Sequence, residues 1–395
     1  MQIDLGIYLT MALASAVFYF GVWLKKRVEL LRKFCIPAPV AGGLLFALLA
    51  FILNITDAAY ITLDTSLQSI FMTAFFTTVG FGADMKQIRE GGFLVAKFVG
   101  IVTLLVLLQD VVGVLLSIPL GMHPAMGLCI GSIAMTGGHG NAASFGPMLE
   151  EMGVTGATVV SVSAATFGLV AGSVMGGPIA RRLILKHKVT LPQTGAAASE
   201  QNVTETVPPL SAKKLTEAAA EIFTVMGIGS IIGEGISSLG ITMPSFIGSL
   251  ITAVIVRNVC DSFGIKLALH EIEAEGEACL NMFLSLALIS LKLWELLDLA
   301  LPMILILLAQ ALLMALYAYF VAYYTMGRDY TACCIAAGLC GFGMGATPNA
   351  MANMDAVTMR FGQCKTAYIV VAVVGGLFVN IANSIILTAF INVLI

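Results

Sequence analysis

Two glycine-rich stretches lie inside long apolar segments of the chain. They are MTGGHGNAASFG, residues 135–146, and GFGMGATPNAMAN, residues 341–353. Glycine lets a backbone turn sharply and lets a ligand approach it closely. A helix that begins at such a turn presents unpaired N–H groups and the positive end of its dipole. The two stretches therefore predict that an anion, such as a carboxylate, is bound without a buried lysine or arginine.

The residues at the two turns are the predicted substrate-binding residues. They are Thr136, Gly137, Gly138, His139, Gly140, Asn141, Gly345, Ala346, Thr347, Pro348 and Asn349. The alternative, packing glycines without a ligand, is weaker because the pattern occurs twice. His139 lacks a second ligand at metal-site spacing, so we expect a hydrogen bond within its turn or a substrate contact. Its protonation near neutral pH leaves a role in proton coupling open.

Amide and carboxylate side chains near the second turn and in the last apolar segment are candidate sodium ligands. Polar side chains inside a membrane are costly and usually functional, and hard cations prefer oxygen ligands. The candidates are Asn353, Asp355, Asn380 and Asn383. Hydrogen bonds between helices are the alternative role. That alternative is stronger for Gln109 and Asp110, which have no glycine-rich turn beside them.

The composition indicates an integral membrane protein. Of the 395 residues, 59% are hydrophobic and 11% charged, and the mean hydropathy is +0.97. Soluble domains carry about 25% charged residues. The eight cysteines have no paired spacing, which argues against a disulfide framework or a zinc site. We expect no cofactor other than sodium as the coupling ion, and no nucleic acid as a partner.

A membrane-spanning helix needs about 20 apolar residues, and we predict ten spans. They cover residues 5–24, 37–53, 67–83, 93–117, 156–180, 218–240, 244–258, 279–298, 301–325 and 367–393. The first is read as a span because no basic residues precede its apolar run, as they would in a signal peptide. Two further apolar segments, about 124–150 and 331–357, contain the glycine-rich turns. We predict that these two segments are re-entrant hairpins.

The distribution of basic residues fixes the predicted orientation. With two hairpins and ten crossings, all but Lys292 of the 20 lysines and arginines lie on the cytoplasmic side, as is usual. Making either hairpin a full crossing destroys this asymmetry. Both termini are then outside, and each half has an odd number of spans. The predicted fold is an all-α polytopic membrane protein with ten transmembrane helices in two inverted five-helix repeats, each with a re-entrant hairpin.

Weak internal similarity supports a duplication with an offset of about 200 residues. The matching pairs are IPAPVAGGLL (36–45) with ITMPSFIGSL (241–250), MGLCIGSIAMTGGHGN (126–141) with CCIAAGLCGFGMGATPN (333–349), and SVMGGPIA (173–180) with AVVGGLFVN (372–380). The predicted parts are a first repeat at 1–188, a polar cytoplasmic linker at 189–214 and a second repeat at 215–395. Interrupted segments at matching places in inverted repeats are typical of secondary transporters.

Two further patterns predict how helices pack. Gly168, Gly172 and Gly176 lie on one helix face, and such a row of small residues lets a second helix approach closely. The acidic stretch LALHEIEAEGEA, residues 267–278, predicts an amphipathic helix on the cytoplasmic surface.

Long motifs of the chain resemble those of the bacterial sodium/glutamate symporter family. They are SIAMTGGHGNAASFG, ATFGLVAGSVMGGPIARRL, LKLWELLDLALPM and AAGLCGFGMGATPNAMANMDAVTMRFG. The resemblance extends from about residue 5 to 390. It implies a sodium-driven symporter selective for L-glutamate in the bacterial inner membrane, a homodimer and an elevator-like mechanism. The turns depart from the family pattern at 141–145 and 349–351, which leaves the choice of substrate most open.

The leading prediction is therefore sodium-coupled import of glutamate, not an enzymatic activity. The alternative is a sodium- or proton-coupled carrier of another organic anion or amino acid, with His139 as the proton-carrying group. An intramembrane hydrolase with Ser144 or Cys340 as the nucleophile and His139 as the base is a third hypothesis. It is disfavoured because no sequence feature orients His139 as a base and because inverted repeats have no role in that chemistry.

Overall fold

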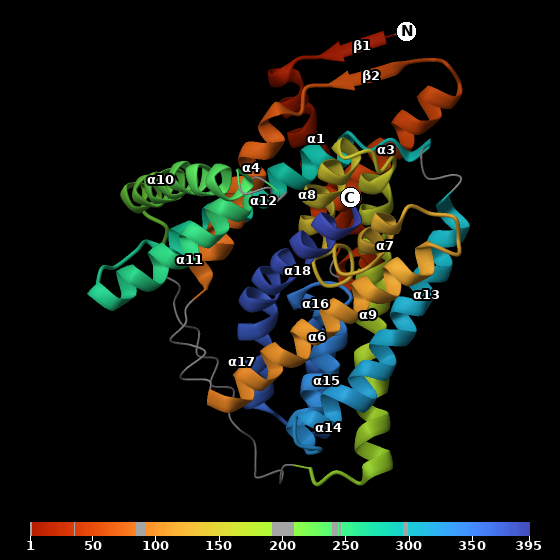
Figure 1. Ribbon diagram of the computed structural model, residues 1–395, viewed down its shortest axis with the longest axis vertical. Coiled ribbons are helices and arrows are strands. Elements are labelled where there is room, and N and C mark those ends of the chain that lie inside the picture. The colour runs from red at the N-terminus through yellow and green to blue at the C-terminus, as the bar shows by residue number, and fades with distance from the viewer. Residues whose placement is uncertain are drawn as a thin grey trace.

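The computed structural model describes residues 2–34, 36–83, 92–191, 209–238, 244, 246–294 and 299–395. In this part of the chain, eight helical runs are long and apolar enough to cross a membrane (Figure 1). Six are α1 (Ile7–Arg27), α3 (Ala38–Ile55), α6 (Gly92–Ser117), α9 (Ala157–His187), α10 (Ala212–Ser237) and α11 (Phe246–Phe263). A short α2 (Glu29–Lys33) follows α1. Each of the eight runs coincides with a predicted span.

The other two runs contain π-helical turns. The first consists of α13 (Ala300–Leu316), η2 (Tyr317–Ala322) and α14 (Tyr323–Thr325). The second consists of α17 (Lys365–Val373), η3 (Val374–Phe378) and α18 (Val379–Leu394). A π-helical turn inside an α-helix often marks a functional site. Residues 192–208 of the predicted linker lie outside the described residues.

The remaining two predicted spans correspond to α4 (Ser66–Gly82) and α12 (Leu269–Ile289). With 17 residues, α4 is short for a span of about 20. The helix α12 begins in the acidic stretch and ends at Ile289, well before residue 298, so the helix predicted at 267–278 is the first part of a longer one. One face of this part is closely packed, since Glu271 is buried and a Cβ at Gly276 would lie 2.2 Å from the Thr78 hydroxyl oxygen of α4.

Two short strands, which the all-α prediction did not include, pair in parallel. They are β1 (Gln2–Leu5) and β2 (Tyr60–Leu63), at the top of Figure 1. The Thr10 hydroxyl of α1 donates to the carbonyl of Leu5 at 3.0 Å and accepts from the N–H of Asp64 at 3.2 Å. The strands thus fasten the start of α1 to the connection between α3 and α4.

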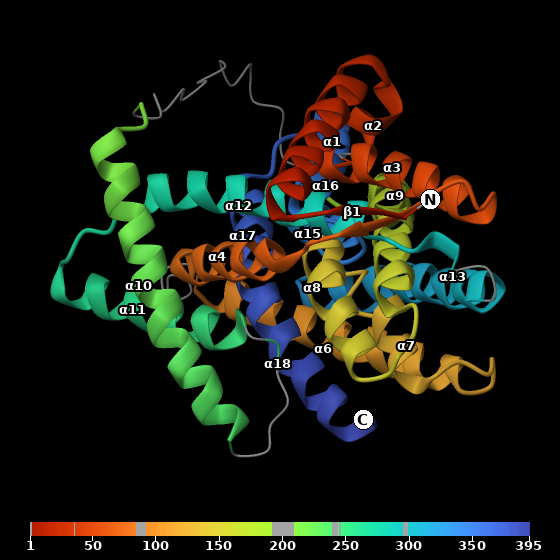
Figure 2. The same ribbon diagram turned by 90° about the horizontal axis from the view of Figure 1, so that it is seen from above.

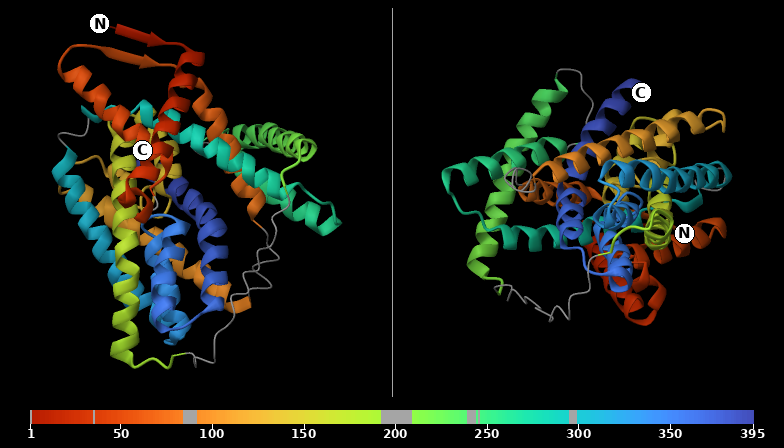
Figure 3. Two further views of the ribbon diagram at one scale, coloured as in Figure 1. Left: turned by 180° about the vertical axis from the view of Figure 1, so that it is seen from behind. Right: turned by 90° about the horizontal axis from the view of Figure 1, so that it is seen from below.

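The helices form two groups by their contacts. In the α4–α12 group, α4 and α12 pack on each other, with α10 and α11 on α4 and with α1 and α3 on α12. Figures 2 and 3 show α10 and α11 at one end of this group and α1 and α3 at the other. The α6–α13 group contains the remaining long helices and both broken segments, arranged around α9 and α15.

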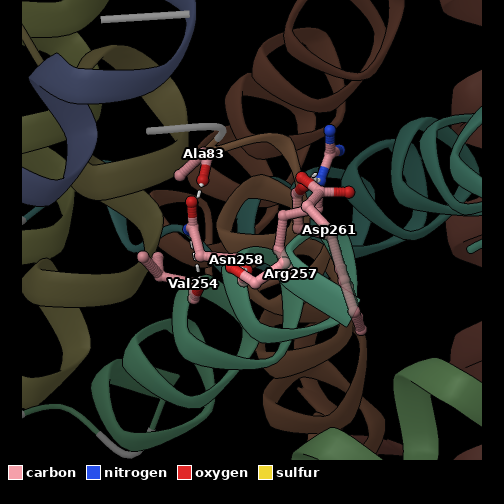
Figure 4. Close-up of polar contacts among 7 residues, drawn as sticks. Ala83, Val254, Arg257, Asn258 and Asp261 are labelled. Carbon is pink, nitrogen blue, oxygen red and sulfur yellow. Dashed lines mark hydrogen bonds and ion pairs between the residues drawn. The ribbon is translucent and has the colours of Figure 1, made fainter. Parts of the chain in front are cut away.

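Polar side chains of α11 hold the C-terminal end of α4 (Figure 4). The Asn258 amide donates to the carbonyl of Ala83 at 2.9 Å. The Arg257 guanidinium pairs with Asp261 at 2.6 Å and donates to the carbonyl of Phe81 at 3.2 Å. A cation near the C-terminal end of a helix also complements the helix dipole. These contacts fix α4, which forms one wall of the site described next, to its neighbour.

Candidate functional site

Both glycine-rich segments are helices interrupted at the predicted glycines. The first consists of α7 (Pro124–Ile130), an irregular turn and α8 (Gly138–Glu151), and the second of α15 (Tyr330–Phe342), a turn and α16 (Thr347–Phe361). The His123 ring nitrogen caps α7, and the Asp329 carboxylate caps α15. Pro348 stands in the first turn of α16, where a helix tolerates proline.

The two turns meet. Gly138 has a left-handed backbone with φ +60°, and a Cβ there would lie 3.0 Å from the carbonyl oxygen of Gly345. Four residues after a glycine in each turn stands an asparagine. A Cβ at Gly137 would overlap the amide of Asn141, and one at Gly345 would lie 2.9 Å from the amide nitrogen of Asn349. Glycine is therefore required at both turns, because asparagine side chains and the opposite turn occupy the space.

A cavity of about 270 Å³ lies where the turns meet. Ligand pockets commonly measure about 300–1,000 Å³, so this one suits a small solute. Ten of the eleven predicted substrate-binding residues line the cavity, and Asn349 does not. The facing wall comes from α4 and α12 and consists of Phe75, Phe76, Leu280 and Leu284. The cavity therefore lies between the two helix groups, and its described lining contains no lysine or arginine.

The cavity offers hydrogen-bond donors. The helices α8 and α16 begin at its wall, and the first N–H groups of a helix have no acceptor within that helix. The Asn141 side chain is 1% exposed and lines the cavity. In the described structure its amide nitrogen has no hydrogen-bond partner. A buried donor without an acceptor costs about 1–3 kcal/mol, so an anionic ligand would complete this group.

His139 lines the same cavity but is held by α9. Its Nε2 lies 3.0 Å from the Thr166 hydroxyl, which itself donates to the carbonyl of Val162. The single hydroxyl proton is thus used, and we assign the Nε2–H as the donor. The partner is on α9 and not in the histidine's own turn. The Ser144 hydroxyl donates to the carbonyl of Asn141 and not to His139, which argues against a hydrolase arrangement.

Two of the candidate sodium ligands have partners away from the cavity. The Asn353 amide is buried and donates to the carbonyl of Gly172 at 2.8 Å, which joins α16 to α9. Asp355 is exposed and accepts a hydrogen bond from the Tyr368 hydroxyl. Both interactions are of the kind that fastens helices together.

The other two candidate sodium ligands lie near the turns. Asn380 lines the cavity. Asn383 is buried and contacts Ser132, in the stretch between α7 and α8, through both ends of its amide. The structure therefore places the four candidates in different surroundings and puts Asn383 beside the first turn.

Sequence reasoning favoured helix–helix hydrogen bonds for Gln109 and Asp110 of α6 because no glycine-rich turn was expected beside them; that premise is wrong, since both contact the turns. The Gln109 amide donates to the carbonyl of Gly343 at 2.7 Å and accepts from the Thr136 hydroxyl at 2.6 Å. Asp110 accepts from the N–H and the hydroxyl of Ser132 at 2.8 and 2.9 Å. A polar pair in the middle of an otherwise apolar 26-residue helix was the available signal.

The glycine row on α9 lies against the second broken segment. A Cβ at Gly168 would lie 2.3 Å from the carbonyl oxygen of Met344, and one at Gly172 would lie 3.0 Å from that of Cys340. The predicted close packing is confirmed. It places the second turn directly on α9.

These features define the protein as a multi-pass helical membrane protein with a small cavity between two broken helices, an arrangement typical of secondary transporters. The chain belongs to the sodium/glutamate symporter family, whose model matches residues 3–363. Proteins named sodium/glutamate symporter from Haemophilus influenzae and Escherichia coli are each 38% identical to it, covering 100% and 96% of both chains. The resemblance predicted from the motifs is confirmed.

The chain was also compared with solved structures. The sodium proton antiporter MjNhaP1 from Methanocaldococcus jannaschii aligns over 98% of both chains at 12% identity with a TM-score of 0.38. That score is too low for a comparison of the two folds.

Proposed function

We propose that this protein is a symporter that uses sodium ions to import L-glutamate. Membership of the sodium/glutamate symporter family and the names of its full-length relatives support this function. The observation that carries the proposal is the cavity between the two turns. Two helix N-termini lie at its wall, Asn141, whose amide nitrogen has no hydrogen-bond partner in the described structure, lines it, and its described lining has no lysine or arginine.

Glutamate matches this cavity because it has two carboxylates and the cavity has two helix N-termini. One carboxylate binds at the start of α8, at His139 and Gly140, where the Asn141 amide donates a further hydrogen bond. The other binds at the start of α16, at Thr347. A charge at a helix N-terminus gains about 0.3–1 kcal/mol at exposed sites and up to about 2 kcal/mol when partly buried. Two such ends favour a dicarboxylate over a monocarboxylate.

Sodium supplies the driving force in this proposal. Each elementary charge that crosses the membrane inward gains about 2.3 kcal/mol per 100 mV. Co-transported sodium ions offset the negative charge of the glutamate anion, and every additional ion adds to the accumulation that the membrane potential supports.

The helix packing supports the proposed inverted repeats. The contact pattern is nearly unchanged when α1, α3 and α4 exchange with α10, α11 and α12. The helix α1 packs on α3 as α10 packs on α11, and α12 contacts α3 and α1 as α4 contacts α11 and α10. In the other group, α6 packs on α18 as α13 packs on α9, and α8 packs on α9 as α16 packs on α17. Such exchange symmetry is expected of a duplicated chain.

The position of the cavity supports an elevator-like form of alternating access. Its polar wall belongs to the α6–α13 group and its apolar wall to α4 and α12. Sliding of the first group along the second would carry a bound substrate across the membrane without dismantling the turns. The family resemblance and the distribution of basic residues further support an inner-membrane homodimer in the lipid bilayer, with both termini periplasmic.

Uptake of radiolabelled glutamate into proteoliposomes tests the function. An inward sodium gradient is expected to drive accumulation, and an equal potassium gradient is not. Replacement Asn141→Ala should raise the KM for glutamate about tenfold or more, since a hydrogen bond to a charged group contributes about 1.5–3 kcal/mol. As the control, Asn281→Ala alters an amide that bonds to its own helix. The absence of sodium-dependent uptake would contradict the proposal.

A second candidate function is a carrier of another organic anion or amino acid, coupled to sodium or protons. The position of His139 in the cavity lining favours this alternative. A panel of competing amino acids and dicarboxylates separates the substrates. Uptake driven by a pH gradient without sodium, lost in His139→Gln, would identify proton coupling.

A further inference from the structure

Three side chains from distant parts of the sequence form a buried oxygen cluster beside the first turn. Asp110 comes from α6, Ser132 from the stretch between α7 and α8, and Asn383 from α18. The Ser132 hydroxyl oxygen lies 2.9 Å from the Asp110 carboxylate and 2.6 Å from the side-chain oxygen of Asn383. All three residues are 0% exposed.

The hydrogen atoms in this cluster are too few for its short oxygen contacts. The Ser132 hydroxyl has one proton but contacts two acceptor oxygens. Rotating the Asn383 amide does not help, because its nitrogen already donates to the Ser132 carbonyl at 3.1 Å. The Ser132 N–H is also used, by the second oxygen of Asp110 at 2.8 Å. One oxygen–oxygen contact therefore requires an additional cation.

The charge of the cluster leads to the same requirement. Buried carboxylates are normally paired with a basic group or coordinate a metal. Among the described residues, the hydrogen bonds of the Asp110 carboxylate all come from Ser132, and none of the ion pairs involves it. The cluster has one negative charge and two neutral oxygen ligands, a set suited to a single monovalent hard cation.

We propose that Asp110, Ser132 and Asn383 bind one of the coupling sodium ions. This inference rests on the proposed sodium-driven transport and deepens it, because it assigns ligands and a route of coupling. The carbonyl of Ser132 accepts from the N–H of Gly137 at 2.8 Å, and Gly137 lines the substrate cavity. A sodium ion held at Ser132 thus fixes the turn from which α8 starts.

The neighbouring residue extends the route to the second turn. Gln109, next to Asp110 on α6, bonds to Thr136 of the first turn and to Gly343 of the second. Ordering of α6 by the ion therefore aligns both carboxylate-binding helix ends. Sodium binding is expected to precede glutamate binding and to raise the affinity for it.

The test counts the radiolabelled sodium ions bound per protomer by the purified protein, without glutamate, in choline chloride of constant ionic strength. The variant Asp110→Asn is expected to bind one ion fewer than the wild type. It should fold, because its new amide group donates to Ser132 and completes the hydrogen bonds. Its thermal midpoint in sodium-free buffer checks this and is expected to equal or exceed that of the wild type.

Two more variants sharpen the test. Ser132→Ala removes one neutral ligand and keeps the carboxylate. It is expected to lower the affinity for the same sodium ion at least tenfold. Asp57→Asn makes the same charge change at an exposed position with a left-handed backbone, φ 53°, that asparagine tolerates. It should bind as many ions as the wild type.

The outcomes separate this inference from the proposed function. An unchanged ion count in Asp110→Asn overturns the inference, because no bound sodium ion then depends on the Asp110 carboxylate. Loss of one ion in that variant supports the sodium site even where wild-type uptake of glutamate proves independent of sodium, and that latter result contradicts the proposed function alone.

Discussion

The replacement Gln109→Leu tests whether α6 holds the two turns together. Leucine has a similar size but makes no hydrogen bond, so the variant loses the 2.7 Å bond to Gly343 and the 2.6 Å bond from Thr136. Each buried hydrogen bond contributes about 1 kcal/mol net. The Thr136 hydroxyl also lies 3.4 Å from the Gly343 carbonyl and can bond to it, which limits the cost of unpaired groups. The expected loss is about 2 kcal/mol.

We expect this loss of free energy to destabilise the arrangement of the two turns that binds substrate. A cost of about 2 kcal/mol corresponds to a factor of about 30 in an equilibrium constant. We therefore expect the KM for glutamate to rise about 30-fold in proteoliposomes with a fixed sodium gradient. The matched control is Gln310→Leu, since Gln310 is equally buried and bonds to the Gln109 carbonyl at 2.8 Å, not to a turn. Its KM should stay within about threefold of the wild type.

Two results would refute the reasoning. A KM in Gln109→Leu within about threefold of the wild type would show that the turns keep their arrangement without the glutamine. Equal effects of both leucine variants would show that the KM responds to lost polarity in the membrane interior and not to the contact between α6 and the turns.

Three further predictions concern packing, charge and capping. Gly168→Val should destabilise the protein by about 1–3 kcal/mol in thermal unfolding, because its Cβ would overlap the Met344 carbonyl. The control Gly177→Val should not, because a Cβ at Gly177 meets no atom within 4 Å. Asn141→Asp should lower glutamate uptake at least tenfold, since it sets a carboxylate against the substrate, and unchanged uptake would place the substrate elsewhere. Arg257→Gln should cost about 1 kcal/mol of stability by removing the cation from the end of α4, and an unchanged thermal midpoint would contradict that role.

Local signals in the sequence predicted the interrupted helices well. Glycine, proline and asparagine change backbone preferences within a few residues, so the turn at Gly137 and Gly138 and the start of α16 at Thr347 could be located directly. Ten of the eleven residues that this argument predicted to bind substrate line the cavity. Hydropathy located the eight long apolar runs for the same reason, since it depends on neighbouring residues only.

Contacts between distant segments could not be predicted in this way. Ser132 and Asn383 are 251 residues apart and Gln109 and Gly343 are 234 apart, and no local pattern selects such partners. The packing partner of the acidic stretch at the start of α12 could not be predicted for a related reason. Its composition predicts an amphipathic helix, but nothing local indicates that Gly276 packs closely on α4.

The proposed repeats explain why the buried oxygen cluster of Asp110, Ser132 and Asn383 forms beside the first turn and has no counterpart beside the second. In the proposed repeats, α6 corresponds to α13, and their polar residues Gln109 and Gln310 meet where these helices pack, 201 residues apart. The residue after Gln109 is Asp110, whereas the residue after Gln310 is Ala311. When the turns are aligned at Asn141 and Asn349, Cys340 stands opposite Ser132. The second half therefore lacks both the carboxylate and the hydroxyl.

This asymmetry has a consequence for coupling. A symmetric pair of cation sites would order each turn separately, whereas a single site on α6 orders both, because Gln109 reaches across to Gly343. The replacement Ala311→Asp tests this directly. It adds a carboxylate at a half-buried position of an apolar helix, without the serine and asparagine oxygens, so it should not raise the number of bound sodium ions and should reduce stability by several kcal/mol. An additional bound ion in this variant would show that the carboxylate alone makes the site, against the role assigned to Ser132 and Asn383.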